Sequence, residues 1–246
     1  MLRNSRGISS KKAQLTFAIV AGMAIMGIFL IYILITYSHE SKMDNPEYIR
    51  KQAELYIGEC MKYNAETAVY LMGLYGGYTS PKTRETTAKF GQEIVFERKD
   101  KVVKAVDEET AKQELSNYIE SSMPFCNRVF KSYEKYGYFT ETDDFKARIS
   151  LNEKDTTLLI NYPLTISRTG ITETMEDFTF KIPVSLKKMI NAVQVIANNE
   201  DVDITSNKDL AVFIDVLPYE DALVYVLTDY ESSLLNEPYK FMFAVS

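Results

Sequence analysis

The pattern of apolar and polar residues separates a short N-terminal part of the chain from a longer remainder. Residues 15–35 read LTFAIVAGMAIMGIFLIYILI, in which Thr16 is the one clearly polar side chain. A helix of this length, rising about 1.5 Å per residue, just exceeds the ~30 Å hydrocarbon core of a bilayer, and it has no polar face. The alternative is a cleaved secretory signal, but the apolar part of such a signal is shorter, about 7–15 residues. We therefore predict a transmembrane helix over residues 13–37.

The charges on either side of this segment predict its orientation. Residues 1–12 contain four Lys or Arg and no acid, whereas Lys42 is the only basic residue close to the other end. Basic residues favour the cytoplasmic side of a membrane helix. We therefore expect a cytoplasmic tail over residues 1–12, a linker over 38–45 and an extracytoplasmic domain over 46–246, at the cell membrane.

A long amphipathic helix is predicted to open this domain. Asn45 and Pro46 suit the start of a helix, and apolar residues then recur at steps of three and four over about 28 residues. Gly76 and Gly77 are typical of a helix end, because glycine adopts the left-handed conformation easily. The alternative is that Gly76, Gly77 and Tyr78 form an accessible contact turn.

The rest of the domain reads as helices followed mainly by strands. Residues 79–91 are expected to form a polar loop. Residues 125–136 are expected to form a helix, which Pro124 separates from the helix before it. Pro163 and Pro183 are expected at strand edges or bends. The pattern predicts an α+β fold in one exported domain, with a helical part (46–137), a strand-rich part (138–246) and an antiparallel or mixed sheet. The other expected elements are a hairpin (93–98 and 101–106), a helix (107–122), strands (145–151, 157–166 and 178–184), a helix (185–197) and closing strands (211–217, 222–227 and 239–245).

Composition excludes several classes of function. Residues 1–12 hold four of the 28 Lys and Arg and none of the 34 acids, so the remainder carries a net charge of about −10. Such a balance argues against nucleic-acid binding, which needs clustered Lys and Arg. His39 is the one histidine, which argues against a histidine-based catalytic triad. We predict no enzymatic activity, no cofactor and no metal site.

The two cysteines are the most informative pair. Cys60 and Cys126 lie on helical segments on the predicted external side, where disulfides persist. A bridge closes a long loop and stabilises the fold by ~4 kcal/mol in the loop-entropy model. Two buried free thiols are the alternative, whereas a redox catalyst is disfavoured because a CxxC motif is absent. We predict a disulfide.

Acidic clusters provide weaker candidates. Asp201, Asp203 and Asp209 supply oxygen atoms that calcium accepts, but the EF-hand spacing is missing. Glu173 lies near Glu176 and Asp177, and paired carboxylates can perform acid–base catalysis. We expect these acids to lie in a solvated loop and in a turn between strands. Tyrosines are candidates for contact surfaces, because they offer a large area at low entropic cost. The alternative is that most of them lie at the edges of the core. They occur at 56, 63, 70, 75, 78, 118, 133, 136 and 138.

The segment KKAQLTF at residues 11–17, followed by the apolar run, resembles the class III signal of archaeal type IV pilin-like proteins. In those proteins a prepilin peptidase cuts after a basic and a small residue. The resemblance implies that Lys12 and Ala13 precede the cut and that Gln14 begins the mature chain. Pilins carry a glutamate as the fifth mature residue, whereas Ala18 stands there, which argues against a filament role.

The rest of the chain contains five short motifs: ECM (59–61), LMGLYGGY (71–78), PFC (124–126), NYPL (161–164) and YKFMFAV (239–245). They are similar to motifs of uncharacterised membrane-anchored proteins of small-genome archaea. The resemblance implies location and architecture rather than a mechanism. We therefore expect a non-catalytic interaction or envelope-structure protein, with the lipid bilayer and a protein at the cell envelope as partners. The alternatives are a pilin-like filament subunit and an enzyme that uses carboxylates alone.

Overall fold

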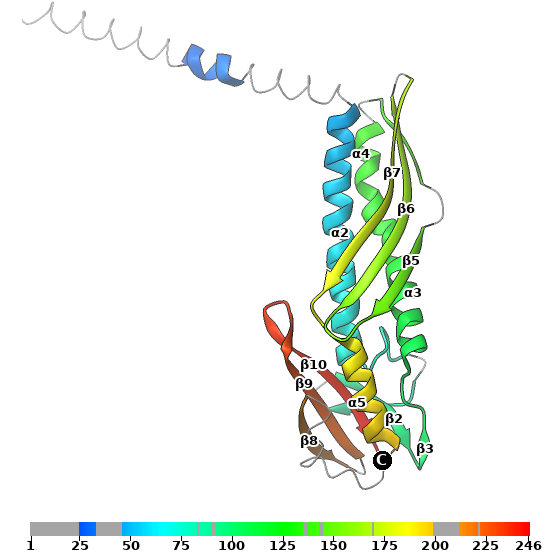
Figure 1. The fold of residues 1–246 in the computed structure, drawn as a ribbon. Helices are drawn as coiled ribbons and strands as arrows, with labels where there is room; N and C mark the ends of the chain where they lie inside the picture. The colour runs from blue at the N-terminus through cyan, green and yellow to red at the C-terminus, as the bar shows by residue number, and fades with distance from the viewer. Residues whose placement is uncertain are drawn as a thin grey trace, which may run out of the picture. The chain divides into compact units, whose positions relative to one another are not determined.

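The structure is a computed structural model, and it divides into two units, residues 1–49 and 50–246, which are described separately. Figure 1 shows the ribbon with its element labels. The described residues are 25–32, 46–82, 84–89, 92–134, 137–142, 145–168, 170–198, 212–220 and 222–246.

The first unit contains the whole of the predicted membrane segment. Of residues 13–37, the structure describes 25–32, which are helical, and the remainder lies outside the described residues. The predicted tail (1–12) and linker (38–45) also lie outside them. Within the described ranges, no helix combines the length and the apolar character needed to span a bilayer.

The helices follow the predicted periodicity closely. Asp107 caps α3 by accepting a hydrogen bond of 2.7 Å from the Thr110 N–H. The prediction that Pro124 separates two helices is wrong, because α3 continues to Cys126 with Pro124 in its last turn, where proline removes only one backbone hydrogen bond. The described helices of the labelled series are α2 (Pro46–Leu74), α3 (Glu108–Cys126), the 3₁₀ helix η1 (Asn127–Phe130), α4 (Lys131–Glu134) and α5 (Leu186–Asn198).

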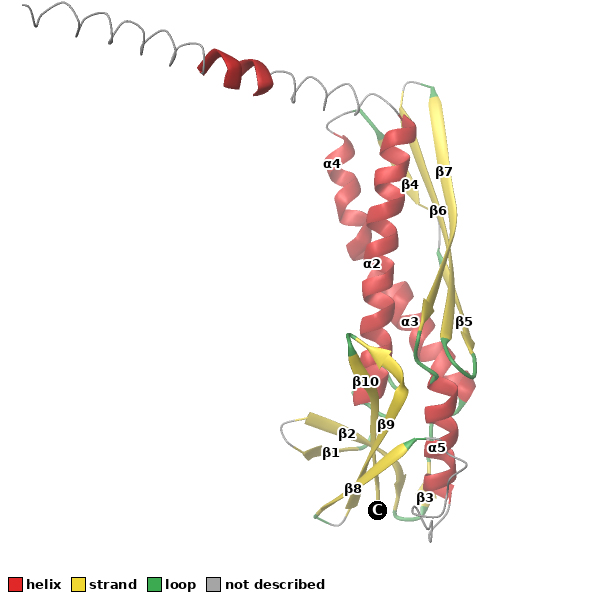
Figure 2. Cartoon of the chain, turned by 60° about the vertical axis from the view of Figure 1, so that its left-hand side comes forward, coloured by secondary structure: helices red, strands yellow, loops and turns green. Residues whose placement is uncertain are grey.

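The first sheet has six strands in the order β1-β2-β10-β9-β8, with β3 paired to β2. Its pairs are antiparallel except β2 with β10, which run parallel and meet only near Ala244 and Val245. α5 packs against β2 and β10 (Figure 2). The strands are β1 (Thr86–Lys89), β2 (Gln92–Lys99), β3 (Val102–Val103), β8 (Phe213–Tyr219), β9 (Ala222–Leu234) and β10 (Glu237–Val245).

The second sheet has four antiparallel strands arranged around β6. One edge of β6 pairs with β5 up to Asn161 and with β4 from Leu164 onward, so Pro163 lies where the partner changes and no ladder donor is lost. This confirms that Pro163 marks an irregular position. The strands are β4 (Phe139–Thr142), β5 (Lys146–Leu151), β6 (Thr156–Arg168) and β7 (Ile171–Ile182).

The described architecture confirms a mixed α+β fold, here with two sheets. Two strands were not predicted: β1 lies within the expected polar loop (79–91), and β4 precedes the first expected strand of the second half. Both are short and pair with a longer neighbour, β2 or β6, so tertiary pairing rather than local pattern makes them strands.

Candidate functional site

The C-terminal end of α2 lies unusually close to strand β10. A Cβ atom at Gly73 would stand 2.3 Å from the Lys240 carbonyl oxygen, so only glycine permits this approach of the two backbones. One turn earlier, the buried Tyr239 hydroxyl donates a hydrogen bond of 2.8 Å to the Val69 carbonyl. These contacts fix the β9–β10 hairpin beside α2.

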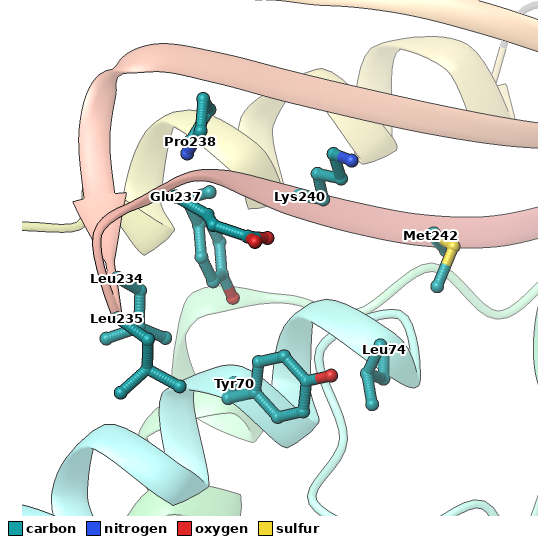
Figure 3. A pocket seen from close by; sticks show the side chains of 9 residues that line it. Tyr70, Leu74, Leu234, Leu235, Glu237, Pro238, Lys240 and Met242 are labelled. Atoms are coloured by element: carbon teal, nitrogen blue, oxygen red, sulfur yellow. The ribbon is translucent and has the colours of Figure 1, made fainter.

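A groove of about 400 Å³ opens between α2 and this hairpin (Figure 3). Tyr70 and Leu74 of α2 line one side, and Leu234, Leu235 and Glu237 of the hairpin line the other, together with Pro238, Tyr239, Lys240 and Met242. Tyr70 is 46% exposed and Leu235 is 63% exposed, whereas Leu234 is nearly buried. The groove is therefore an apolar surface bordered by one carboxylate and one ammonium group.

The hairpin turn holds Leu235 in a strained conformation. Leu235 and Asn236 have φ angles of 54° and 66°, as a two-residue type I′ turn requires. Asparagine and glycine tolerate this region, but a leucine there costs ~1–2 kcal/mol. The turn thus presents an exposed apolar side chain at the groove at the expense of local stability, a combination often found at functional sites.

A second, shallower groove of about 500 Å³ runs between α2 and β7. Phe178 and Phe180 stack with their rings 6.4 Å apart, and Leu55 and Gly58 of α2 complete the apolar part. The surrounding charged residues are Lys51, Glu54, Glu59 and Lys62. Both signs of charge are present, so the rim gives no electrostatic preference.

The predicted contact turn is placed in the interior. Gly76 and Gly77 have φ angles of 63° and 95°, and the Gly77 N–H bonds the Met72 carbonyl at 2.7 Å, which closes the end of α2. Both glycines are buried, and Tyr78 is 2% exposed beneath the Arg84 guanidinium at 4.1 Å. The turn therefore serves as a helix cap in this fold, and its role in partner contact stays a prediction.

Beside this turn lies a buried carboxyl group that the sequence pattern did not indicate. Glu97 on β2 is fully buried; its Oε2 atom accepts a hydrogen bond of 2.6 Å from the Val106 N–H, whereas Oε1 has no hydrogen-bond partner. Burial raises the pKa of Glu97 to about 8. The hydrogen bond from the Val106 N–H and the charge of Arg84 lower this pKa, but their effect is smaller. Glu97 lies between Phe96 and Arg98, and a charged residue in a strand normally indicates an exposed position, so no sequence signal marked it.

The predicted disulfide is present and joins two helices. Cys60 of α2 is bonded to Cys126, the last residue of α3. The Asn64 side chain donates to the Cys126 sulfur at 3.4 Å. The bridge therefore fixes the end of α3 against the middle of α2.

The remaining candidates do not form a site with these groups. Lys12, Ala13 and Gln14, and the acids Asp201, Asp203 and Asp209, lie outside the described residues. The expectation that Glu173, Glu176 and Asp177 occupy a turn is wrong, because they lie within β7. Within the described part of the chain, no group of three or more His, Cys, Asp or Glu side chains is placed to hold a metal ion.

Comparison with known proteins returns no relative: no family model, curated protein or solved structure matches this sequence.

Proposed function

We propose that this chain is a single-pass membrane-anchored protein whose exported unit binds a protein partner through the groove between α2 and the β9–β10 hairpin. The observation that carries the proposal is the exposed Leu235, held at the groove by a strained turn. Such a side chain lowers stability and adds nothing to the core, so binding is its physical rationale. The occupant that suits the lining is a peptide segment with an apolar side chain.

Two further features support a location outside the cytoplasm. The Cys60–Cys126 disulfide is typical of proteins in oxidising compartments. The apolar segment 15–35 has the length of a membrane helix, and the basic residues before it favour a cytoplasmic N-terminus. A non-catalytic role agrees with the lining of the groove, which contains a single carboxylate and no histidine or cysteine.

The topology is tested in intact cells with single added cysteines. Glu109, whose side chain is 85% exposed, and Ser5 in the N-terminal tail are each replaced by cysteine in the full chain. A membrane-impermeant maleimide should label Glu109→Cys in whole cells and Ser5→Cys only after lysis. Labelling of Ser5→Cys alone in whole cells would show the opposite orientation. Recovery of the chain in the soluble fraction would refute the membrane anchor.

The groove is tested by photo-cross-linking in the cells that produce the protein. A photoreactive amino acid at position 235 should give a discrete cross-linked product that disappears when Tyr70 is changed to Glu. The control is the same amino acid at position 139, because Phe139 is 72% exposed but lies on the second sheet. Equal products from both positions, or a product insensitive to Tyr70→Glu, would refute binding in the groove.

A filament subunit is the second candidate, supported by the pilin-like run at Lys12, Ala13 and Gln14. Mass spectrometry of the mature N-terminus decides it. A chain that begins at Gln14 supports processing, and an intact N-terminus refutes it. An enzyme that acts through carboxylates alone stays a prediction with no site assigned to it.

A further inference from the structure

One face of α2 carries tyrosine and glutamate in strict alternation. Tyr56, Glu59, Tyr63, Glu66 and Tyr70 follow one another at steps of three and four residues, a set that we call the tyrosine–glutamate ladder. The three tyrosines are 43%, 68% and 46% exposed. Glu59 is exposed and Glu66 is half-buried. The ladder therefore lies at the surface along its whole length.

The ladder is not needed to hold α2 in the fold. The buried face of the helix is a different one, and its side chains are fully buried at Ala53, Ile57, Met61, Ala65, Ala68 and Met72. A helix face that meets only water is usually filled with small or charged helix-forming residues. Here a large aromatic side chain is exposed at every seventh position, which is an unfavourable arrangement for a surface that stays solvated.

The spacing of the ladder selects a helical partner. Residues seven apart on α2 are separated by about 10.5 Å along the helix axis. A second helix packed alongside repeats its side chains at the same distance, and the alternation of three and four steps keeps the contact on one seam. An extended strand repeats its side chains every ~6.7 Å and falls out of register after one step.

The charge of the ladder selects the chemistry of that partner. Glu59 and Glu66 lie between the tyrosines, so a partner helix needs Lys or Arg opposite them and apolar groups opposite the rings. Arginine also stacks on tyrosine faces, which adds to the preference for a basic helix. Tyr70 belongs both to the ladder and to the groove, so the two surfaces are continuous.

We propose that the tyrosine–glutamate ladder of α2 docks a basic amphipathic helix of a partner protein. The inference deepens the proposed function and rests on it, because it names the kind of partner that the exported unit receives. Tyr118 of α3 lies next to Tyr63 and widens the aromatic surface at the centre of the ladder, where burial and the neighbouring Tyr63 raise the pKa of Tyr118.

The test uses the full chain in phosphatidylcholine nanodiscs and a defined probe. The probe is a helical peptide of about 21 residues with Leu and Arg alternating at steps of three and four. A second peptide carries Glu in place of Arg. Fluorescence anisotropy of each labelled peptide should show saturable binding of the Arg peptide alone, and empty nanodiscs measure its binding to lipid.

Matched variants separate the ladder from general acidity. Tyr63→Ser and the double change Glu59→Gln/Glu66→Gln should each weaken the Arg peptide about tenfold, the loss expected for one central contact. The controls are Tyr230→Ser, at a tyrosine 71% exposed on β9, and Glu93→Gln/Glu109→Gln, which removes the same charge elsewhere. The controls should change the affinity less than twofold, and circular dichroism verifies that all variants are folded.

The other outcomes distinguish failure of the ladder from failure of the groove. Equal loss in ladder and control variants means that the peptide responds only to net charge. Self-association of the full chain that the ladder variants abolish, with no peptide binding, assigns the face to a second copy of the chain. If the ladder variants bind the Arg peptide as tightly as the wild type, and the cross-link at position 235 is still formed, the ladder is refuted and the proposed function stands. If the ladder variants weaken peptide binding but no cross-link forms at position 235, the groove is refuted instead.

Discussion

The Oε2 atom of Glu97 accepts a hydrogen bond of 2.6 Å from the backbone N–H of Val106. The other carboxyl oxygen lies at the end of α2, where a Cβ atom on Gly76 would stand 3.1 Å from it. The C-terminal end of a helix carries partial negative charge, so it disfavours an ionised carboxylate there, as burial also does. A neutral carboxyl group is therefore built into the junction between α2 and the first sheet.

The first prediction concerns the pH dependence of stability. The pKa of Glu97 is raised in the folded state, to about 8 from an ordinary value of 4.5, so the folded state binds the proton more tightly than the unfolded state. The contribution of Glu97 to the free energy of unfolding is fully present below pH ~4.5. It is lost as the pH rises to about 8, by up to ~1.4 kcal/mol per pH unit. Glu97→Gln should flatten this decline in a series of thermal unfolding curves of the full chain in detergent.

Glu93→Gln is the matched control for that series, because Glu93 is exposed on the same strand. It should retain the wild-type decline between pH 5 and 8. A decline of equal slope in Glu97→Gln would show that another group binds the proton.

The second prediction concerns the disulfide, which joins positions 66 residues apart. Opening a loop of this length should cost ~4 kcal/mol in the chain-entropy model, because the unfolded chain gains freedom. For a unit of this size the expected fall in Tm is about 10 °C. Unfolding with and without a phosphine reductant measures it, and the Cys60→Ser/Cys126→Ser variant should show the lower Tm and no further response to the reductant.

The third prediction contrasts two glycines of the same helix. Gly73→Ala places a methyl group against the Lys240 carbonyl and should lower the free energy of unfolding by ~1–3 kcal/mol through overpacking. Gly58→Ala meets only Phe178 at an ordinary 3.9 Å and should raise stability by up to ~1 kcal/mol through helix propensity. Urea unfolding compares them. Equal effects of the same sign would contradict the close approach of α2 and β10.

The fourth prediction separates stability from binding at the hairpin turn. Leu235→Gly relieves a positive φ angle and should raise stability by ~1 kcal/mol, while it removes the side chain that we assign to the partner. Asn236→Gly relieves the neighbouring φ angle and keeps Leu235. Cross-linking through a photoreactive group placed at position 74, on the opposite side of the groove, should fall in Leu235→Gly and persist in Asn236→Gly.

Local features of the fold were predictable from the sequence, and non-local ones were not. The cap at Asp107 and the glycines that end α2 act within a few residues, so the pattern around them indicated both boundaries. The short strand β1 exists because β2 pairs with it, and nothing in its own four residues requires a strand. Pro124 suggested a break, but it lies close enough to the end of α3 to be tolerated.

The same distinction holds for the candidate site. Cys60 and Cys126 were predicted to pair because there are only two cysteines, each on an expected external helix. The burial of Glu97 was not predictable, because both faces of β2 are covered. Ile94 packs with Val224 and Ala244, while Glu97 faces the end of α2. The groove was also not predictable, since it brings together Tyr70 and Leu235, which lie 165 positions apart in the chain.

The parallel pairing of β2 with β10 has a kinetic consequence. It joins Phe96 to Ala244, so the first sheet closes only after all residues up to Ala244 have been synthesised. Until then the β2 edge that β10 will occupy is open to pairing with other chains, and contacts this distant in sequence form slowly. A nascent chain of this kind therefore exposes an unpaired strand edge for longer than one built from neighbouring hairpins.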